Sequence, residues 1–310
     1  MAATERVSGE VSEAAAGRRP AGSSLPRGEG AGIVAFVVAL GFAGCMDALV
    51  KLVGDRAGLG EVMVWRSFGA LALLAPVLIL AGRWRRLVPR RWGFVFLRGA
   101  LLGIGTALFF YGLGGLTLPV AYTITFTMPL MLSAMAVVFL GERLGRRNLA
   151  AIALGFLGVM VALDVRPWDF DDSVLSWHAA AALLATALYA AALMLVRIAD
   201  QEETTEAMVT GALLAGGAVA LVLLPFDPLT SSAQGDWLLL AGIALAAVLS
   251  QLAVTQAFRW APATRLAPFE YTVMIWGILF GVLIWGDWPS LGACLGGGLV
   301  IVASTIAVHR

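Results

Sequence analysis

LPVAY, residues 118–122, leads through an apolar run to FLGE at residues 139–142. APATR, residues 261–265, leads through a similar run to IWGD at residues 284–287. Each stretch has a proline near its start, polar and aromatic residues in its first half, and a glycine followed by an acid at its end. The two stretches lie about 145 residues apart, nearly half of the 310-residue chain. This spacing predicts an internal duplication.

The composition predicts the environment of the chain. Hydrophobic residues make up 60% of it and charged residues only 13%, and the mean hydropathy is +0.89. A transmembrane helix needs about 20 mostly apolar residues to cross a hydrocarbon core about 30 Å thick. The sequence therefore predicts an all-α membrane protein, a bundle of ten transmembrane helices. The predicted spans are residues 32–53, 62–80, 95–116, 119–140, 149–163, 175–196, 207–224, 237–258, 266–285 and 291–308.

The duplication extends along most of the chain. EVMV at residues 61–64 matches EAMV at residues 206–209. Each copy holds five predicted helices, and because five is odd the second copy enters the membrane from the opposite side. We therefore expect two inverted five-helix repeats, residues 31–165 and 174–308, after a disordered cytoplasmic tail at residues 1–30. Inverted repeats place a binding site near the middle of the bilayer, between the two halves.

Basic residues are concentrated in alternate loops, and the opposite loops are mainly acidic. By the positive-inside rule, both termini are predicted to be cytoplasmic in a multi-pass protein of the inner (plasma) membrane. The net charge of +1 provides no basic surface for nucleic acid. The arginines on the predicted cytoplasmic side are Arg6, Arg18, Arg19, Arg27, Arg83, Arg85, Arg86, Arg90, Arg91, Arg143, Arg146, Arg147, Arg197, Arg259, Arg265 and Arg310.

A set of residues spread along the chain resembles the pattern of a known family. They are the prolines that begin the fourth and ninth spans, Pro129 within the fourth span, the closing pairs Gly141–Glu142 and Gly286–Asp287, and Arg66 early in the second span. The pattern resembles the drug/metabolite transporter superfamily, in particular its branch with two EamA domains. The resemblance implies ten helices, cytoplasmic termini and proton-linked or exchange transport of small metabolites.

One segment and two departures refine the resemblance. Residues 266–272, LAPFEYT, are similar to a segment of members assigned to S-adenosylmethionine or riboflavin uptake. The second copy has Asp287 where the family usually has Glu, and Gly211 where the first copy has Arg66. The two halves are therefore not expected to be functionally equivalent.

Charged residues within the predicted spans are the first candidates for function, because each costs at least about 2.5–3.5 kcal/mol at the bilayer centre. Glu270 is predicted to face a seam between helices that is lined by Gly277 and Gly281, which would pack neighbouring helices closely. It is a candidate for proton coupling or for holding a cationic part of a substrate. The alternative is a structural carboxylate that caps a helix or pairs with an arginine.

Four further intramembrane charges lie near span ends. Arg66 could hold a substrate carboxylate or phosphate through two parallel hydrogen bonds, or extend toward the interface. Asp47 and Lys51 are four residues apart, which favours a structural salt bridge over a coupling site. Arg98 is predicted to extend toward the cytoplasmic headgroups as an anchor.

Polar and aromatic residues of the predicted spans complete the candidate set. Tyr122, Thr125 and Pro129 share a face of the fourth span, and Pro129 frees a backbone carbonyl that could line a cavity. Tyr271, Trp276 and Gln256 could stack on and hydrogen-bond a planar ligand, although each taken singly is more often a packing residue. Tyr111, Gln251 and Thr255 could add to the same set.

These features favour a secondary transporter that moves a small amino-acid-, nucleoside- or vitamin-like metabolite by alternating access. The expected partners are that substrate, the lipid bilayer, and protons or a counter-substrate, with the chain a monomer or homodimer. No cofactor or metal is expected, because no phosphate-binding loop and no His/Cys cluster occurs. A channel or a membrane-embedded enzyme remains the alternative.

Overall fold

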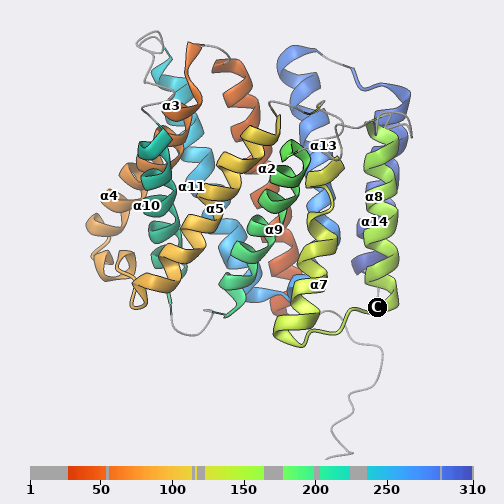
Figure 1. The fold of residues 1–310 in the computed structure, drawn as a ribbon, viewed down its shortest axis with the longest axis horizontal. Coiled ribbons are helices and arrows are strands. Elements are labelled where there is room, and N and C mark those ends of the chain that lie inside the picture. Colours follow the sequence, from red (N-terminus) through yellow and green to blue (C-terminus); the bar gives the residue numbers. More distant parts are fainter. Residues whose placement is uncertain are drawn as a thin grey trace, which may run out of the picture.

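The computed structural model describes residues 27–53, 56–113, 116, 123–163, 177–198, 203–223, 236–286 and 288–308, and they form one helical bundle (Figure 1). No strand occurs in these ranges. The helices, with π-helical or 3₁₀ turns marked η, are α2 Arg27–Val53, α3 Leu59–Val64, η2 Trp65–Gly69, α4 Ala70–Leu80, η3 Trp84–Leu87, α5 Trp92–Leu113, α7 Met128–Leu140, α8 Arg146–Ala162, α9 Trp177–Ile198, α10 Thr205–Leu223, α11 Trp237–Trp260, α12 Ala263–Leu266, η7 Ala267–Tyr271, α13 Thr272–Phe280, η8 Gly281–Trp285 and α14 Leu291–Val308.

Eight helical stretches of the described residues are long and apolar enough to cross a membrane. Three of them are composite: α3, η2 and α4 form one, residues 123–125 and α7 form another, and α12, η7, α13 and η8 form the third. The shorter helices α8 and α14 complete the ten predicted spans. The prediction of an all-helical membrane bundle is therefore confirmed. The eight stretches are 28–53, 60–80, 92–109, 123–140, 177–198, 205–222, 237–260 and 263–285.

The contacts between helices follow the duplication. The most extensive contacts join α2 to α11, α5 to α9, and α8 to α14. When the two halves are exchanged, the α2–α11 pair becomes the α9–α5 pair, and the α8–α14 pair maps onto itself. The pairs α7 with α9 and α13 with α2 are related in the same way. Helices of one half therefore pack mainly on helices of the other, as two repeats related by a pseudo-twofold axis would.

Glycines set the close approach of some of these pairs. A Cβ atom on Gly158 of α8 would lie 2.8 Å from the carbonyl oxygen of Gly296 of α14, and one on Gly99 of α5 would lie 2.8 Å from the Cα of Ala212 of α10. Because small residues let backbones approach in lipid, these glycines explain the tight α8–α14 and α5–α10 pairs.

The predicted seam at Gly277 and Gly281 is wrong for this bundle. A Cβ atom on either glycine would meet no described atom within 4 Å, and Gly277 is exposed. The reason is their place in α13 and η8, where these positions turn away from α2, while Trp276 makes the contact with it. The pair therefore does not join helices within the described chain.

The Gly-acid pairs lie at the ends of the fourth and ninth spans, where the local backbone conformation favours glycine. Gly141 and Gly286 have φ values of +63° and +70°, in the left-handed region where glycine carries no Cβ penalty. The chain therefore ends each helix at the corresponding position of the two copies. The amide of Glu142 bonds back to the Ala136 carbonyl at 3.1 Å, which closes the first of these ends.

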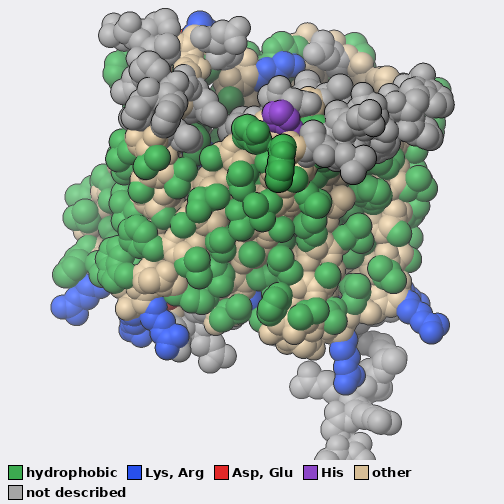
Figure 2. Space-filling view, in the orientation of Figure 1, with side chains coloured by type: hydrophobic (Ala, Val, Ile, Leu, Met, Phe, Trp, Pro, Cys, Tyr) green, Lys and Arg blue, Asp and Glu red, His purple; other side chains and the backbone are tan. Residues whose placement is uncertain are grey.

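The surface fits a membrane protein. Figure 2 shows hydrophobic side chains covering the side of the bundle, with the visible Lys and Arg side chains near its two ends. Gly32 near the start of α2 adjoins Ala261, and the Ala307 carbonyl near the end of α14 bonds Arg265, so the two described ends of the chain meet the same end of the bundle. This end also carries Arg86, Arg197 and Arg259, and is called the arginine-rich end below.

Candidate substrate site

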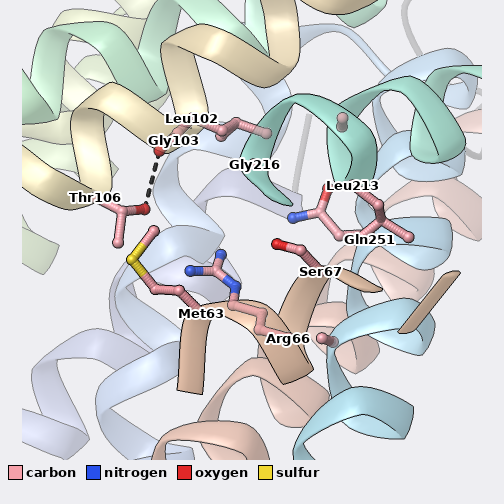
Figure 3. Close-up of a pocket in the computed structure, with 11 residues that line it drawn as sticks. Met63, Arg66, Ser67, Leu102, Gly103, Thr106, Leu213, Gly216 and Gln251 are labelled. Carbon is pink, nitrogen blue, oxygen red and sulfur yellow. Dashed lines mark hydrogen bonds between the residues drawn. The ribbon is translucent and has the colours of Figure 1, made fainter. Parts of the chain in front are cut away.

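The second span is interrupted where its arginine occurs. Residues 65–69, WRSFG, form the π-helical turn η2 between α3 and α4. Such turns are rare and are frequently found at functional sites. A Cβ atom on Gly69 would lie 2.9 Å from the Trp65 ring, so the turn depends on a glycine at its end. The turn presents Arg66 and Ser67 to the interior of the bundle (Figure 3).

Arg66 and Ser67 line a small hollow between the two halves. Figure 3 shows the polar ends of Arg66, Ser67, Thr106 and Gln251 directed toward this space. Its volume of about 40 Å³ holds roughly three water molecules, at about 10–15 Å³ each. First-half helices supply Met63, Arg66, Ser67, Leu102, Gly103 and Thr106, and second-half helices supply Ala212, Leu213, Gly216, Ala247 and Gln251.

Two further polar residues adjoin this hollow. The Tyr189 hydroxyl on α9 lies 2.8 Å from the Thr106 hydroxyl in the wall. Asp47 on α2 is exposed, and its carboxylate interacts electrostatically with the Arg66 guanidinium and with Tyr189. An arginine and several neutral hydrogen-bonding groups thus gather between the halves, and an exposed acid interacts electrostatically with the arginine. We call Asp47, Arg66, Ser67, Thr106, Tyr189 and Gln251 the central polar cluster.

The structure corrects the expected pairing of Asp47 with Lys51. These two side chains form no ion pair with each other; the Lys51 ammonium lies 4.1 Å above the ring of Trp285. The two residues share a helix but not an environment, because the Asp47 carboxylate interacts electrostatically with Arg66, whereas the Lys51 ammonium contacts the Trp285 ring of η8. We therefore group the exposed Asp47 with Arg66 and not with Lys51, which the i,i+4 spacing did not indicate.

Arg98 also differs from its expected place. Its side chain is 0% exposed, so it is not an interfacial anchor. The guanidinium donates at 3.3 Å to the Met208 carbonyl, to Gln251 Oε1 and to Thr255 Oγ1. The reason is that α5 packs against α10, which turns this position inward. Through Gln251, Arg98 positions a member of the central polar cluster.

Glu270 and Tyr271 lie apart from this cluster, on the 3₁₀ turn η7. Tyr271 is 0% exposed, and its ring packs over Gly155, where a Cβ atom would lie 2.7 Å from a ring carbon. The predicted stacking of Tyr271 on a ligand is therefore wrong in this conformation. Glu270 Oε2 and the Tyr271 hydroxyl are both buried without a hydrogen-bond partner among the described residues.

The other predicted substrate contacts separate from one another. The Trp276 indole donates to the Val37 carbonyl at 3.2 Å and joins α13 to α2. Gln256 Oε1 accepts from the Thr205 hydroxyl at 2.7 Å, beside a different opening of about 660 Å³ at the arginine-rich end. Neither reaches the central polar cluster, since each side chain already contacts a neighbouring helix.

The fourth span is broken, as its proline suggests. A turn at Phe126 and Thr127 separates a short helical segment from α7, and Pro129 occupies the first turn of α7, where its missing amide costs nothing. Thr125 lies just before this turn and is half-buried. Tyr122 lies outside the described residues.

A junction at the arginine-rich end joins the two copies of the repeated stretch. The Glu142 carboxylate accepts hydrogen bonds from the Ala263 amide at 3.3 Å and from the Thr264 amide and hydroxyl at 3.0 and 2.9 Å. Arg197 Nε lies 3.6 Å from the same carboxylate. The acid that closes one copy thus binds the start of the other. We call Glu142, Arg197, Ala263 and Thr264 the Glu142 junction.

Comparison with known proteins agrees with this architecture. Residues 30–163 and 176–308 each match the EamA-like transporter family, and the chain therefore belongs to this family. Its class is that of multi-pass membrane transporters and not of enzymes.

Three relatives and one solved structure illustrate the similarity. The chain is 26% identical over 285 residues to an S-adenosylmethionine uptake transporter of Rickettsia felis (89% of this chain, 92% of the relative). It is 25% identical over 265 residues to a pseudopaline exporter of Pseudomonas aeruginosa (86% and 91%). It is 28% identical over 236 residues to a riboflavin transporter of Vibrio cholerae (76% and 77%). A crystal structure shares the fold with a TM-score of 0.78, at 17% identity over 90% of this chain and 96% of that one.

Proposed function

We propose that the protein is a secondary carrier of the inner membrane that moves a small organic metabolite by alternating access. The observation that carries the proposal is the central polar cluster, which is built from both halves and lies between them. A site between inverted repeats can face either side of the membrane as one half rocks against the other. Both termini are assigned to the cytoplasm, following the arginine distribution.

The size of the central hollow supports a carrier over a channel. A hollow of about 40 Å³ cannot hold a metabolite. Admission of a substrate therefore requires the walls to separate. Since the walls are supplied by helices of both halves, their separation is the motion that alternating access needs.

The charges of the cluster favour a zwitterionic substrate. The Arg66 guanidinium can bind a carboxylate through two parallel hydrogen bonds, and the Asp47 carboxylate can bind an ammonium group. Thr106, Tyr189 and Gln251 can hydrogen-bond neutral groups between them. An amino-acid-like group that carries both charges satisfies Asp47 and Arg66 together, whereas a nucleoside- or vitamin-like substrate with one charge would satisfy one of them.

A matched panel of compounds tests this substrate class. Purified protein is heated with neutral α-amino acids, their carboxamides and their deaminated acids. Binding to the folded state raises the unfolding temperature by mass action. The amino acids should raise it and the two singly charged analogues should not. An equal rise with the deaminated acids would overturn the zwitterionic assignment.

Transport in proteoliposomes tests the carrier itself. The vesicles are loaded with an unlabelled amino acid selected by the thermal measurement, and the same amino acid in radiolabelled form is added outside. The label should accumulate transiently inside, because a carrier couples its entry to the exit of the unlabelled amino acid. Simple run-down of the label to equilibrium would indicate a channel. The orientation is tested separately with cysteine probes at Arg146 and Ser231: reagent outside intact cells should modify the probe at 231 and not the one at 146.

Glu270 is proposed as the proton-coupling residue of the carrier. Support comes from its buried, unpartnered oxygen, since a carboxyl group in such surroundings is unlike a structural salt bridge. Its place outside the central polar cluster separates the two roles: Arg66 and Asp47 would hold substrate, and Glu270 would exchange a proton.

A further inference from the structure

The arginine-rich end contains a second hollow that the transport cycle does not require. Its volume is about 440 Å³, and it lies where the loop between α7 and α8 meets the start of α12. Arg143, Arg146 and Arg147 come from the first half and Arg265 from the second. The positive-inside rule explains an excess of arginine on this side, but not the convergence of four of them on one hollow.

Among the described residues in the wall of this hollow, the one acid, Glu142, is engaged elsewhere. Glu142 accepts three hydrogen bonds from Ala263 and Thr264 and pairs with Arg197, so its charge is directed into the junction. In contrast, the side chains of Arg143, Arg146 and Arg147 are exposed and have no hydrogen-bond or ion-pair partner within the described residues. Among the described residues that line it, the hollow therefore has four arginines and one acid, whose charge is already paired.

The wall also contributes backbone donors. Helix α8 begins at Arg146, and no side chain caps its first amides. The first intrahelical bond runs from Leu149 to the Gly145 carbonyl at 3.0 Å, so the preceding amides of the helix remain available to an acceptor. An anion in the hollow would meet these amides as well as the arginines.

The surroundings identify a lipid as the source of this anion. Leu149 and Leu157 are 51% and 52% exposed on α8, which begins at the hollow, and Leu295 and Ile301 are 57% and 56% exposed on its partner α14. An apolar helix face next to a basic hollow suits a molecule with an anionic head and acyl chains. We propose that this hollow binds the phosphate headgroup of an anionic phospholipid, whose chains lie along α8 and α14.

A bound headgroup would act on both halves of the bundle at once. Asn148 of the first half donates to the Thr264 carbonyl of the second at 2.9 Å, so the hollow adjoins a contact that already joins the halves. Arg265 is held within the second half, where it donates to the Ala307 carbonyl at 3.1 Å. A phosphate between Arg265 and the arginines of the α8 region would add another link beside the Glu142 junction. The lipid should therefore stabilise the conformation in which this end is closed.

The thermal stability of delipidated protein in detergent tests the site. Phosphatidylglycerol is the anionic probe, phosphatidylcholine is the zwitterionic one, and glycerol phosphate is the soluble anion. Phosphatidylglycerol should raise the unfolding temperature of the wild type, and phosphatidylcholine should not. The triple variant Arg143→Gln, Arg146→Gln, Arg147→Gln should bind phosphatidylglycerol at least about tenfold more weakly, since each arginine near an anionic headgroup contributes about 1 kcal/mol.

A matched variant removes the same charge elsewhere on this side. Arg83, Arg85 and Arg90 are exposed arginines outside the hollow, and changing all three to Gln should leave the phosphatidylglycerol effect intact. An equal loss in both triple variants would show nonspecific attraction and overturn the site. An equal rise with glycerol phosphate would overturn the lipid assignment in favour of a soluble anion. If the first triple variant is unstable, Arg146→Gln alone is compared with Arg85→Gln by the same criterion.

Discussion

At the scale of single residues, Arg66 and Asp47 are the strongest candidates for substrate contact, because Arg66 of η2 lines the central hollow and interacts electrostatically with the exposed Asp47 of α2. Arg66→Lys keeps the positive charge but removes the forked geometry. We expect a severalfold to about hundredfold loss of affinity for a zwitterionic probe in Arg66→Lys, measured by thermal shift, with normal membrane insertion. An unchanged affinity would leave Arg66 as a structural residue.

Substitution of Asp47 tests the negative charge of the central polar cluster. Asp47→Asn should lose affinity for the amino acid while gaining relative preference for the deaminated acid, because the ammonium partner is gone and the Arg66 site remains. Lys51→Gln is the control, since Lys51 lies on the same helix and contacts the Trp285 ring instead of the cluster. An equal loss of affinity in both variants would contradict this role for Asp47.

The Glu270→Gln variant distinguishes a proton-coupling role for Glu270 from a structural one. Glu270→Gln keeps an acceptor but cannot exchange a proton, so it should abolish proton-driven net uptake while substrate exchange continues at a similar rate. The measurement is uptake into proteoliposomes with and without an imposed pH gradient. Unchanged gradient-driven uptake by this variant would remove the coupling role.

At the scale of helices, two glycines of the second half occupy opposite environments. A Cβ atom on Gly296 would lie 2.8 Å from the Ala162 amide nitrogen, whereas one on Gly277 would meet no described atom within 4 Å. Gly296→Ala should destabilise the α8–α14 pair by about 1–3 kcal/mol, because backbone atoms cannot yield. Gly277→Ala should be neutral or slightly stabilising. Thermal unfolding in one detergent compares them, and an equal decrease would contradict the packing described above.

Sequence periodicity could predict the spans but not which face of each helix is buried. The apolar runs predicted the spans, since a helix that crosses lipid needs a long apolar stretch. The Gly-acid pairs marked two helix ends, since a residue with left-handed backbone conformation is usually glycine. Arg98 was misplaced because its partners lie 110 to 157 residues away in sequence. The partner of Asp47 was predicted wrongly because Lys51, four residues later on the same helix, is a plausible salt-bridge partner in the sequence. Tyr189 and Thr106 carried no sequence signal beyond being polar residues in apolar helices.

At the scale of the whole molecule, the Glu142 junction joins the two copies at the arginine-rich end. Glu142→Ala removes the acceptor for three donors and one ion pair. We expect this end to open more often, so that a cysteine at Ala263, which is 0% exposed in the wild type, reacts severalfold faster with a thiol reagent. The background lacks the two native cysteines, Cys45 and Cys294.

A control for the junction lies at the same end of the bundle. Glu206→Ala removes a more exposed ion pair with Arg86, at 3.2 Å, and should leave the reactivity at residue 263 unchanged. Equal labelling of the Glu142→Ala variant and the wild type would show that the junction does not keep this end closed.

The buried position of Arg98 has a consequence for biogenesis. The ribosome makes Arg98 at least 110 residues before its partners Met208, Gln251 and Thr255. When the third span leaves the translocon, this guanidinium therefore faces lipid or the insertion machinery without the acceptors that later surround it. We therefore expect the first half alone to be an unstable membrane domain until the second half supplies these acceptors. Pulse-labelled chains truncated after residue 198 should accordingly be degraded faster than the full-length protein, and Arg98→Leu should slow that degradation.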